Sequence, residues 1–335
     1  MLRELTIAAS FEPSNGYGFF TVKIIEHLVQ HGVRVKLTPL HGHPPVGSLR
    51  SYLNTAPPKV HDIMFTSISN NPTDTSATVL VTMSETMALP WEYGHSLGRH
   101  KHVIVPSKYS ADAVAPWAKK TRTKVHVSPL GVTMPWSPIR FDPFTFTAIA
   151  TDHACPDRKR IQELTDTFSK TFPVEPDVRL QLKRAPECRK IITFDSRVHI
   201  VAARLPNAAY DEIVHGTTVG VQPSLMEGWS LPTNQFIAVG RPVITGLAGA
   251  IGDWLSPECT FQVDHSVRKA PQAVYLGKGN IPFADMAGIG RQMRFCYENR
   301  FEVARRAVRA YEHAQKYTVH TMGQSFLNLC QAILS

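Results

Sequence analysis

The segment from residue 219 to residue 245 constrains the fold of this chain more than any other stretch. A short apolar strand at 219–221 is followed by a turn, by a helix expected at 232–239 and by a second strand at 242–245. Proline in the first helical turn and Gly240 behind the last one are typical of helix ends. This order predicts a βαβ unit with parallel strands, whose carboxyl ends border a ligand-binding crevice.

The same alternation of strands and helices runs along the rest of the chain. Apolar stretches predict strands at 5–9, 33–37, 78–82, 102–106, 124–131, 144–149, 178–182 and 198–201. Helical spacing of apolar residues predicts helices at 19–31, 111–119, 158–172, 283–314 and 320–334. A glycine-rich turn at 13–18 follows the first strand, and residues 38–75 have no regular pattern. The chain is therefore expected to be an α/β protein built on parallel sheets.

A proline-rich stretch divides this pattern into two halves. With 335 residues the chain is long enough for two domains. We expect an N-terminal Rossmann-like domain at 1–133, a linker at 134–143 and a C-terminal Rossmann-like domain at 144–318. The final helix, 319–335, is expected to pack back toward the first domain.

Composition limits the class of protein. A hydrophobic share of 43% and a charged share of 19% are typical of a globular protein. No run of about 18 apolar residues occurs, so we expect no transmembrane segment. Five widely spaced cysteines without a C-x-x-C pair indicate free thiols in a reducing compartment. We predict a cytoplasmic location, which is the host cytoplasm if a phage encodes the protein.

The net charge of +9 is concentrated in the first part of the chain. Residues 1–140 contain 14 Lys and Arg against 8 Asp and Glu, whereas residues 141–335 contain 22 against 19. The densest basic clusters are 99–102 and 119–124. Such a surplus fits a polyanionic partner or an acidic membrane surface, and it also fits a merely soluble surface.

Chemistry is concentrated in residues 223–232, which read PSLMEGWSLP. The start of the following helix offers free N–H groups that can bind a diphosphate. Glu227 is then placed beside those phosphates, where its carboxylate can accept hydrogen bonds from sugar hydroxyls. The alternative is structural, because a glutamate near a helix N-terminus also stabilises the helix dipole.

Residues 223–244 resemble the signature of family 4-like retaining glycosyltransferases, P-S-x-x-E-G-[FW]-G-L-P followed by E-A-M-A-x-G-x-P-V-I. The resemblance implies the GT-B fold, in which two Rossmann-like domains have parallel sheets that face a central cleft. It also implies that Glu227 contacts the donor sugar. The second glutamate of the family, which binds the ribose hydroxyls, is Gln235 in this chain, and Ser230 replaces a glycine of the pattern. The resemblance implies that the nucleotide-sugar binds the segment made of Gly228, Trp229, Ser230, Leu231 and Gln235.

Other stretches resemble the same family in the expected order. Gly16 and Gly18 lie in a stretch similar to the N-terminal glycine loop that faces the donor phosphates. Glu85 begins a stretch similar to E-T-x-x-L-P, which implies a role in the active site; the structural alternative is an interdomain ion pair. Arg158 and Lys159 resemble the R-K pair that opens the first helix of the second domain, whose lysine binds the donor diphosphate. An arginine that is common about five residues earlier is absent.

The resemblance implies a retaining hexosyl- or pentosyltransferase that uses a nucleotide-sugar, with a UDP-sugar as the expected donor. Glu227, Lys159 and Glu85 are the expected catalytic residues. No D-x-D motif occurs, so we predict that no metal is required. Two acceptors fit the basic first domain: 5-hydroxymethylpyrimidine in DNA, as in phage enzymes of similar size, and a lipid-linked or cell-surface glycan. The compact chain favours DNA. Gln235 also leaves open a catalytically inactive relative that only binds its ligands.

Overall fold

The structure is a computed structural model, and it divides into two compact units. It describes residues 4–11, 16–42, 44–45, 47–54, 57–67, 76–150, 156–188, 190–270 and 279–334. The first unit consists of Met1–Gly131 with Tyr317–Ser335, and the second consists of Val132–Lys316.

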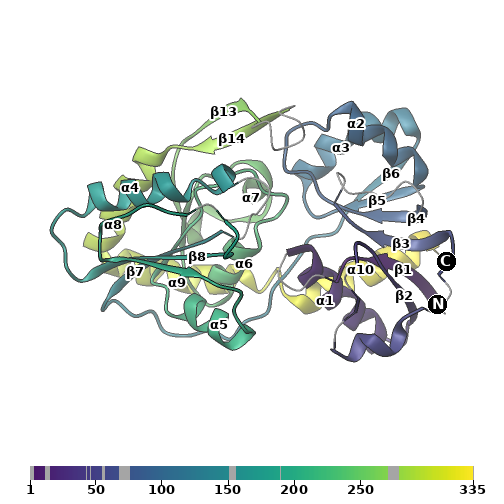
Figure 1. Ribbon diagram of the computed structural model, residues 1–335, viewed down its shortest axis with the longest axis horizontal. Helices are drawn as coiled ribbons and strands as arrows, with labels where there is room; N and C mark the ends of the chain where they lie inside the picture. The colour runs from purple at the N-terminus through teal and green to yellow at the C-terminus, as the bar shows by residue number, and fades with distance from the viewer. Residues whose placement is uncertain are drawn as a thin grey trace. The chain divides into compact units, whose positions relative to one another are not determined.

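The first unit is a parallel sheet covered by helices (Figure 1). Its strands are β1 (Glu4–Ala9), β2 (Arg34–Pro39), β3 (Val60–Phe65), β4 (Ser76–Val81), β5 (His102–Val105) and β6 (Lys124–Val127), in the order β2-β1-β3-β4-β5-β6. Its helices are α1 (Gly16–Gln30), α2 (Trp91–Gly94), α3 (Lys108–Thr121) and α10 (Val319–Leu334), with short 3-10 turns at Gly47–Tyr52 and His95–Arg99. The described pairs of neighbouring strands are parallel, as the sequence pattern predicts.

Helix α10 belongs to the first unit because it packs on α1. Gly323 lies so close to α1 that a Cβ at this position would clash with the imidazole of His27. Phe326 continues the contact into the core, where its ring centroid lies 5.5 Å from that of Phe65. Helix α10 therefore contributes to the same hydrophobic core as α1 and β3.

The second unit repeats this architecture. Its parallel strands are β7 (Phe144–Ala150), β8 (Val178–Arg184), β9 (Val198–Ala202), β10 (Val219–Val221), β11 (Val243–Thr245) and β12 (Thr260–Gln262), in the order β12-β11-β10-β7-β8-β9. Its helices are α4 (Ile161–Thr171), α5 (Asn207–His215), α6 (Leu231–Ala238), α7 (Gly249–Trp254), α8 (Met286–Glu298) and α9 (Arg300–Ala314), with 3-10 turns at Pro156–Lys159 and Pro257–Cys259. Figure 1 shows α4 and α8 on one face of this sheet and α5 and α9 on the other.

The centre of the second sheet is fully buried. All residues of β7 are buried, as expected for a strand in the middle of a parallel sheet that is covered on both faces. A cluster of phenylalanines packs beside it, with 5.0 Å between the ring centroids of Phe144 and Phe146 and 5.8 Å between those of Phe146 and Phe172. This rigid centre holds the carboxyl ends of β7 and β10 in place.

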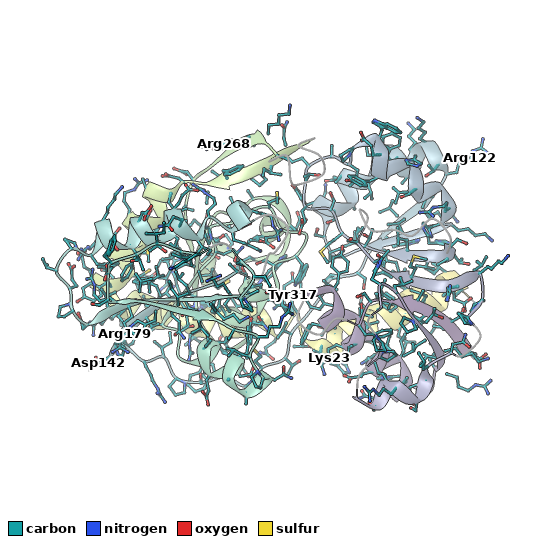
Figure 2. All side chains as sticks on the ribbon, viewed as in Figure 1. Lys23, Arg122, Asp142, Arg179, Arg268 and Tyr317 are labelled. Atoms are coloured by element: carbon teal, nitrogen blue, oxygen red, sulfur yellow. The ribbon has the colours of Figure 1, made fainter. Side chains whose placement is uncertain are left out.

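Several elements differ from the sequence pattern. The expected irregular stretch 38–75 contains β3, and α1 begins at Gly16, so that Gly16 and Gly18 lie in the first helical turn rather than in the loop. The expected helix 283–314 is two helices behind β14 (Asn280–Ala284), which forms an antiparallel hairpin with β13 (His265–Lys269). Neither strand alternates, because β13 is exposed along its length whereas most of β14 is buried. Arg268 (Figure 2) stands on this hairpin, 5.2 Å above the ring centroid of Phe283.

Two general properties follow from the described residues. None of the helices in this part of the chain is long and apolar enough to cross a membrane. Cys259, Cys296 and Cys330 are buried free thiols, and Cys188 is partly accessible. Burial raises the pKa of Cys330 to about 12, because a thiolate would lose its hydration.

Candidate active site

The turn between β10 and α6 carries the predicted site. It leaves the carboxyl end of β10, and Ser224 forms an antiparallel bridge with Phe283 of β14. Helix α6 begins at Leu231, and the preceding Ser230 has a φ of +76°. This backbone conformation favours glycine, which explains the glycine of the family pattern. The hydroxyl of Ser230 lies 2.8 Å from that of Thr233 and helps to hold the turn.

Lys159 and Glu227 form a buried ion pair in this turn. Their side chains come from segments 68 residues apart, and Nζ of Lys159 lies 2.5 Å from Oε1 of Glu227. The amide of Gln222 donates to the same carboxylate oxygen over 3.1 Å and to the carbonyl of Ser224 over 2.9 Å. Arg158 donates to the carbonyl of Met226 over 2.8 Å. The structure therefore brings together three residues that the sequence predicted, Arg158, Lys159 and Glu227. It adds Gln222, which was not predicted from the sequence.

Lys159 also lines a large cavity, together with residues of α4 and of the loop behind β8. It has a volume of about 670 Å³ and reaches from Lys159 to the ends of β7 and β8, at Ala150 and Arg184. A volume of about 300–1,000 Å³ is typical of small-molecule sites, and the carboxyl edge of a parallel sheet is where such sites occur. Arg184 closes the adjoining loop by donating to the carbonyl of Cys188 over 2.6 Å. The cavity is large enough for a nucleotide.

Asp195 lines the cavity and forms an ion pair with Arg197. This ion pair should make the stability of the protein depend on pH. Arg197 is 2.7 Å from the carboxylate of Asp195, and Ser169 donates to the same group over 2.8 Å. The hydrogen bond from Arg197 lowers the pKa of Asp195 from 3.8 to about 2. Since the folded protein prefers the ionised form, this stabilisation is complete above pH 4 and is lost as the pH falls toward 2.

Asp195→Asn should therefore cost about 1–2 kcal/mol of unfolding free energy at pH 7, allowing for partial solvent screening. Urea denaturation at pH 7 and at pH 2.5 measures the effect. The difference between variant and wild type should shrink at the lower pH. An equal difference at both values would contradict the assignment of the low pKa to this carboxylate.

Trp229 has a structural role through its side chain. Its indole is buried and stacks on Trp254, with 4.8 Å between the ring centroids and 16° between the planes. The indole N–H of Trp254 donates to the carbonyl of Trp229 over 2.9 Å. A buried ring cannot stack on a nucleotide, so any contribution of Trp229 to ligand binding is through its backbone.

Gln235 lies in α6 and is held by a residue that the sequence did not suggest. The hydroxyl of Tyr210, in α5, donates to Oε1 of Gln235 over 2.6 Å. Burial raises the pKa of this phenol well above its usual value, so Tyr210 stays protonated and remains a donor. The only sequence signal for Tyr210 is an aromatic residue near the start of a helix, which is too common to indicate a site.

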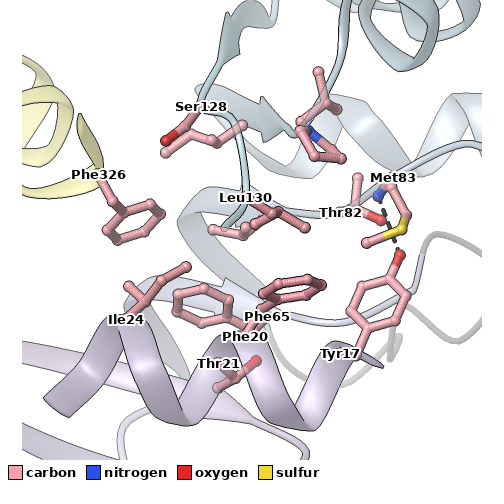
Figure 3. A pocket seen from close by; sticks show the side chains of 14 residues that line it. Tyr17, Phe20, Thr21, Ile24, Phe65, Thr82, Met83, Ser128, Leu130 and Phe326 are labelled. Atoms are coloured by element: carbon pink, nitrogen blue, oxygen red, sulfur yellow. Dashed lines mark hydrogen bonds between the residues drawn. The ribbon is translucent and has the colours of Figure 1, made fainter. Parts of the chain in front are cut away.

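The remaining predicted residues lie in the first unit. Tyr17 stands between Gly16 and Gly18, and its hydroxyl accepts a hydrogen bond of 3.1 Å from the N–H of Met83 (Figure 3). Burial, with a smaller contribution from the charge of Glu85, raises the pKa of Tyr17. The glycine turn and the Glu85 segment are therefore neighbours. The apolar cavity in Figure 3 has a volume of about 30 Å³, which is room for about one water molecule and not for a sugar.

The described part of the chain contains no evident metal-binding site. No group of three or more His, Cys, Asp or Glu in these residues is placed to hold a metal ion. That no metal is required therefore stays a prediction.

Comparisons with known proteins identify the fold. No protein-family model matches the chain, and no curated protein matches it in sequence. Among solved structures, sucrose-phosphate synthase from Thermosynechococcus elongatus has a TM-score of 0.70 at 12% identity, over 99% of both chains. WaaG, a glycosyltransferase involved in lipopolysaccharide biosynthesis, has a TM-score of 0.60 at 12% identity, over 97% of this chain and 99% of its own.

The pneumococcal O-GlcNAc transferase GtfA, in complex with UDP and GlcNAc, has a TM-score of 0.57 at 14% identity. The match covers 81% of this chain and 56% of GtfA, so the chain spans only about half of that protein. At such identities the likeness establishes the fold alone. With two units that are each a parallel sheet between helices, the chain has the GT-B fold of these glycosyltransferases.

Proposed function

We propose that this chain is a retaining glycosyltransferase that transfers a sugar from a nucleotide-sugar, with a UDP-sugar as donor. The observation that carries the proposal is the buried pair of Lys159 and Glu227, with Glu227 in the turn that leads into α6 and Lys159 lining a cavity of nucleotide size. The GT-B fold supports it, since the similar structures are glycosyltransferases and the one of GtfA contains UDP and GlcNAc.

Each group of the site has a task in this proposal. The ammonium of Lys159 neutralises the leaving diphosphate, and Arg158 adds positive charge nearby. The backbone N–H groups of Gly228 to Leu231, which lead into the N-terminus of α6, are proposed to donate to phosphate oxygens. Glu227 accepts hydrogen bonds from the sugar. These groups act by positioning and charge stabilisation, and no protein nucleophile is needed.

Residues of the first unit complete the proposal. Gly16, Gly18 and Glu85 are proposed to act on the donor phosphates and in the active site, as the family resemblance implies. The hydrogen bond between Met83 and Tyr17 holds the glycine turn next to the Glu85 segment. This proximity supports the proposal that both segments contribute to the same site.

The proposed acceptor is a 5-hydroxymethylpyrimidine in DNA. The two basic clusters of the first unit meet at the amino ends of β5 and β6, where the N–H of Lys124 donates to the carbonyl of Lys101 over 2.9 Å. Lys119, Lys120 and Arg122 (Figure 2) are exposed at the adjoining end of α3. Active sites occupy the opposite, carboxyl edge of such sheets. These cations therefore contribute if the acceptor belongs to a polyanion that extends beyond the active site, as a DNA duplex does.

Binding to DNA makes a salt-dependent prediction. If about four of these cations contact phosphates, affinity for duplex DNA should fall about a hundredfold between about 50 and 200 mM salt. Replacing Lys119 and Lys120 with glutamine should reduce the slope of log affinity against log salt by about two, whereas Lys170→Gln in the second unit is the control. Fluorescence anisotropy with a labelled duplex measures both. Affinity that does not change with salt would rule out DNA as the partner of this surface.

The proposed activity is tested by incubating the protein with UDP-, GDP- and ADP-sugars and hydroxymethylated DNA. Transfer is detected by mass spectrometry of the nucleosides, and NMR of the product shows whether the anomeric configuration is retained. Inversion would refute the retaining mechanism. Binding of nucleotides without hydrolysis or transfer would indicate a binding protein instead of an enzyme.

A further inference from the structure

Lys183 is a buried lysine close to the carboxyl end of β8. Its side chain is 6% exposed, and in the sheet it is paired with Ile149 near the end of β7. Among the residues that the structure describes, none forms a hydrogen bond or an ion pair with its ammonium group. Its recorded contact is with the ring of Tyr210, whose centroid is 5.8 Å from Nζ. A buried ammonium group normally has an anionic partner or several hydrogen-bond acceptors.

The surroundings of Lys183 do not neutralise its charge. Burial lowers the pKa of the ammonium, because the charged form loses hydration. Cys188 and, to a smaller extent, the charge of Glu187 act in the opposite direction, whereas the charge of Arg204 acts in the same direction as burial. The Glu187 carboxylate is exposed and is paired with Arg204 at 3.1 Å. The described residues around Lys183 therefore leave a positive charge that an acceptor from outside the chain can compensate.

Gln235 contacts the same tyrosine as Lys183 and provides further hydrogen-bond donors, the N–H groups of its amide. The distance of 2.6 Å from Tyr210 is typical of an O–H···O bond, so the phenol donates and Oε1 of Gln235 accepts. The N–H groups of the Gln235 amide are left to donate, and no described residue accepts from them. Tyr210 contacts both Lys183 and Gln235 and so joins the two. A ligand at this place must offer acceptor oxygens.

We propose that Lys183 and Gln235 bind a phosphate oxygen of the donor nucleotide; this inference rests on the proposed function. Glu227 offsets part of the charge of Lys159, so a diphosphate, which carries at least two negative charges, gains from a further cation. Lys183 supplies this cation from β8, which pairs with β7, the strand that precedes the Lys159 turn. Both residues lie toward the carboxyl edge of the sheet. Gln235 in place of a carboxylate has a physical reason in this arrangement, since a carboxylate there would pair with Lys183 and repel phosphate.

The first test is Lys183→Met, which keeps most of the volume and removes the charge. Calorimetric titration should show binding of UDP weakened about ten- to a hundredfold, as expected for a charge-assisted hydrogen bond, with binding of uridine unchanged. The thermal midpoint of the ligand-free variant should stay the same or rise, because the charge of a largely buried lysine is removed. A lower midpoint with equal losses for UDP and uridine would show a merely structural lysine and overturn the proposal.

The second test is Gln235→Glu, which changes one atom and adds a negative charge. UDP should bind about tenfold more weakly or worse, and uridine should be much less affected. Tighter binding of UDP to this variant would overturn the proposal, because the position would then favour a carboxylate.

The wild-type titration separates this inference from the proposed function. UDP, GDP and ADP are titrated first, and the best binder with its matching nucleoside replaces UDP and uridine where it is not UDP. Wild-type protein that binds none of the three would overturn the donor assignment and this inference together. Wild-type protein that binds a nucleotide which Lys183→Met binds equally well would overturn this inference alone.

Discussion

Replacing Glu227 with glutamine is expected to lower sugar transfer about a hundred- to a thousandfold, the range found when one preorganised polar group of an active site is lost. Glutamine keeps the size of the side chain and an oxygen that can accept from Lys159, but it loses the charge. Steady-state transfer from the nucleotide-sugar measures the effect, together with the unfolding midpoint. Glu258→Gln, an exposed glutamate of the same unit, is the matched control and should transfer normally.

The ion pair with Lys159 decides which variant is informative. Glu227→Ala would leave a buried ammonium without its carboxylate, which typically costs about 3–5 kcal/mol of unfolding free energy. Loss of activity in that variant would mix chemistry with stability. Glu227→Gln that transfers sugar at the wild-type rate, while the control behaves normally, would refute the assignment of Glu227 to the active site.

Replacing Arg241 with methionine is expected to destabilise the second unit by about 3–5 kcal/mol, because the change leaves several buried oxygens without their hydrogen-bond donor. Arg241 is 0% exposed, and its guanidinium donates to six oxygens. The acceptors are the carbonyls of Thr217, Ser137, Val239, Pro138 and His215 and the hydroxyl of Ser137, at 2.7–3.2 Å.

These bonds fasten residues 137–138 to the end of α6 and the start of β10. Burial lowers the pKa of Arg241 to about 10, so it stays charged at neutral pH and its loss should be equally costly between pH 6 and pH 8. Urea denaturation measures the free energy. Arg179→Met, at an exposed site on β8 (Figure 2), is the control and should change stability by less than about 0.5 kcal/mol. A similarly small effect for Arg241→Met would contradict the role of the guanidinium.

The order of strands and helices could be predicted from the sequence because it depends on local patterns. Apolar runs such as 144–149 and helical spacing such as that of 158–172 repeat within a few residues, and they locate β7 and α4 to within a few positions. The turn before α6 is also local, since proline and glycine mark both ends of that helix. Where the pattern is weak, as in β3 and in the hairpin of β13 and β14, these elements were missed.

The partners of the site residues were decided by tertiary structure. The sequence suggested Lys159 and Glu227 separately, but only the adjacency of β7 and β10 in the sheet places them in one buried pair. The burial of Trp229 depends on Trp254, and the orientation of Gln235 depends on Tyr210. Lys183 looks like an ordinary strand residue until the packing of α5 buries it. Periodicity reports which face of an element is apolar, whereas contacts between distant segments arise only when the sheet sets those segments side by side.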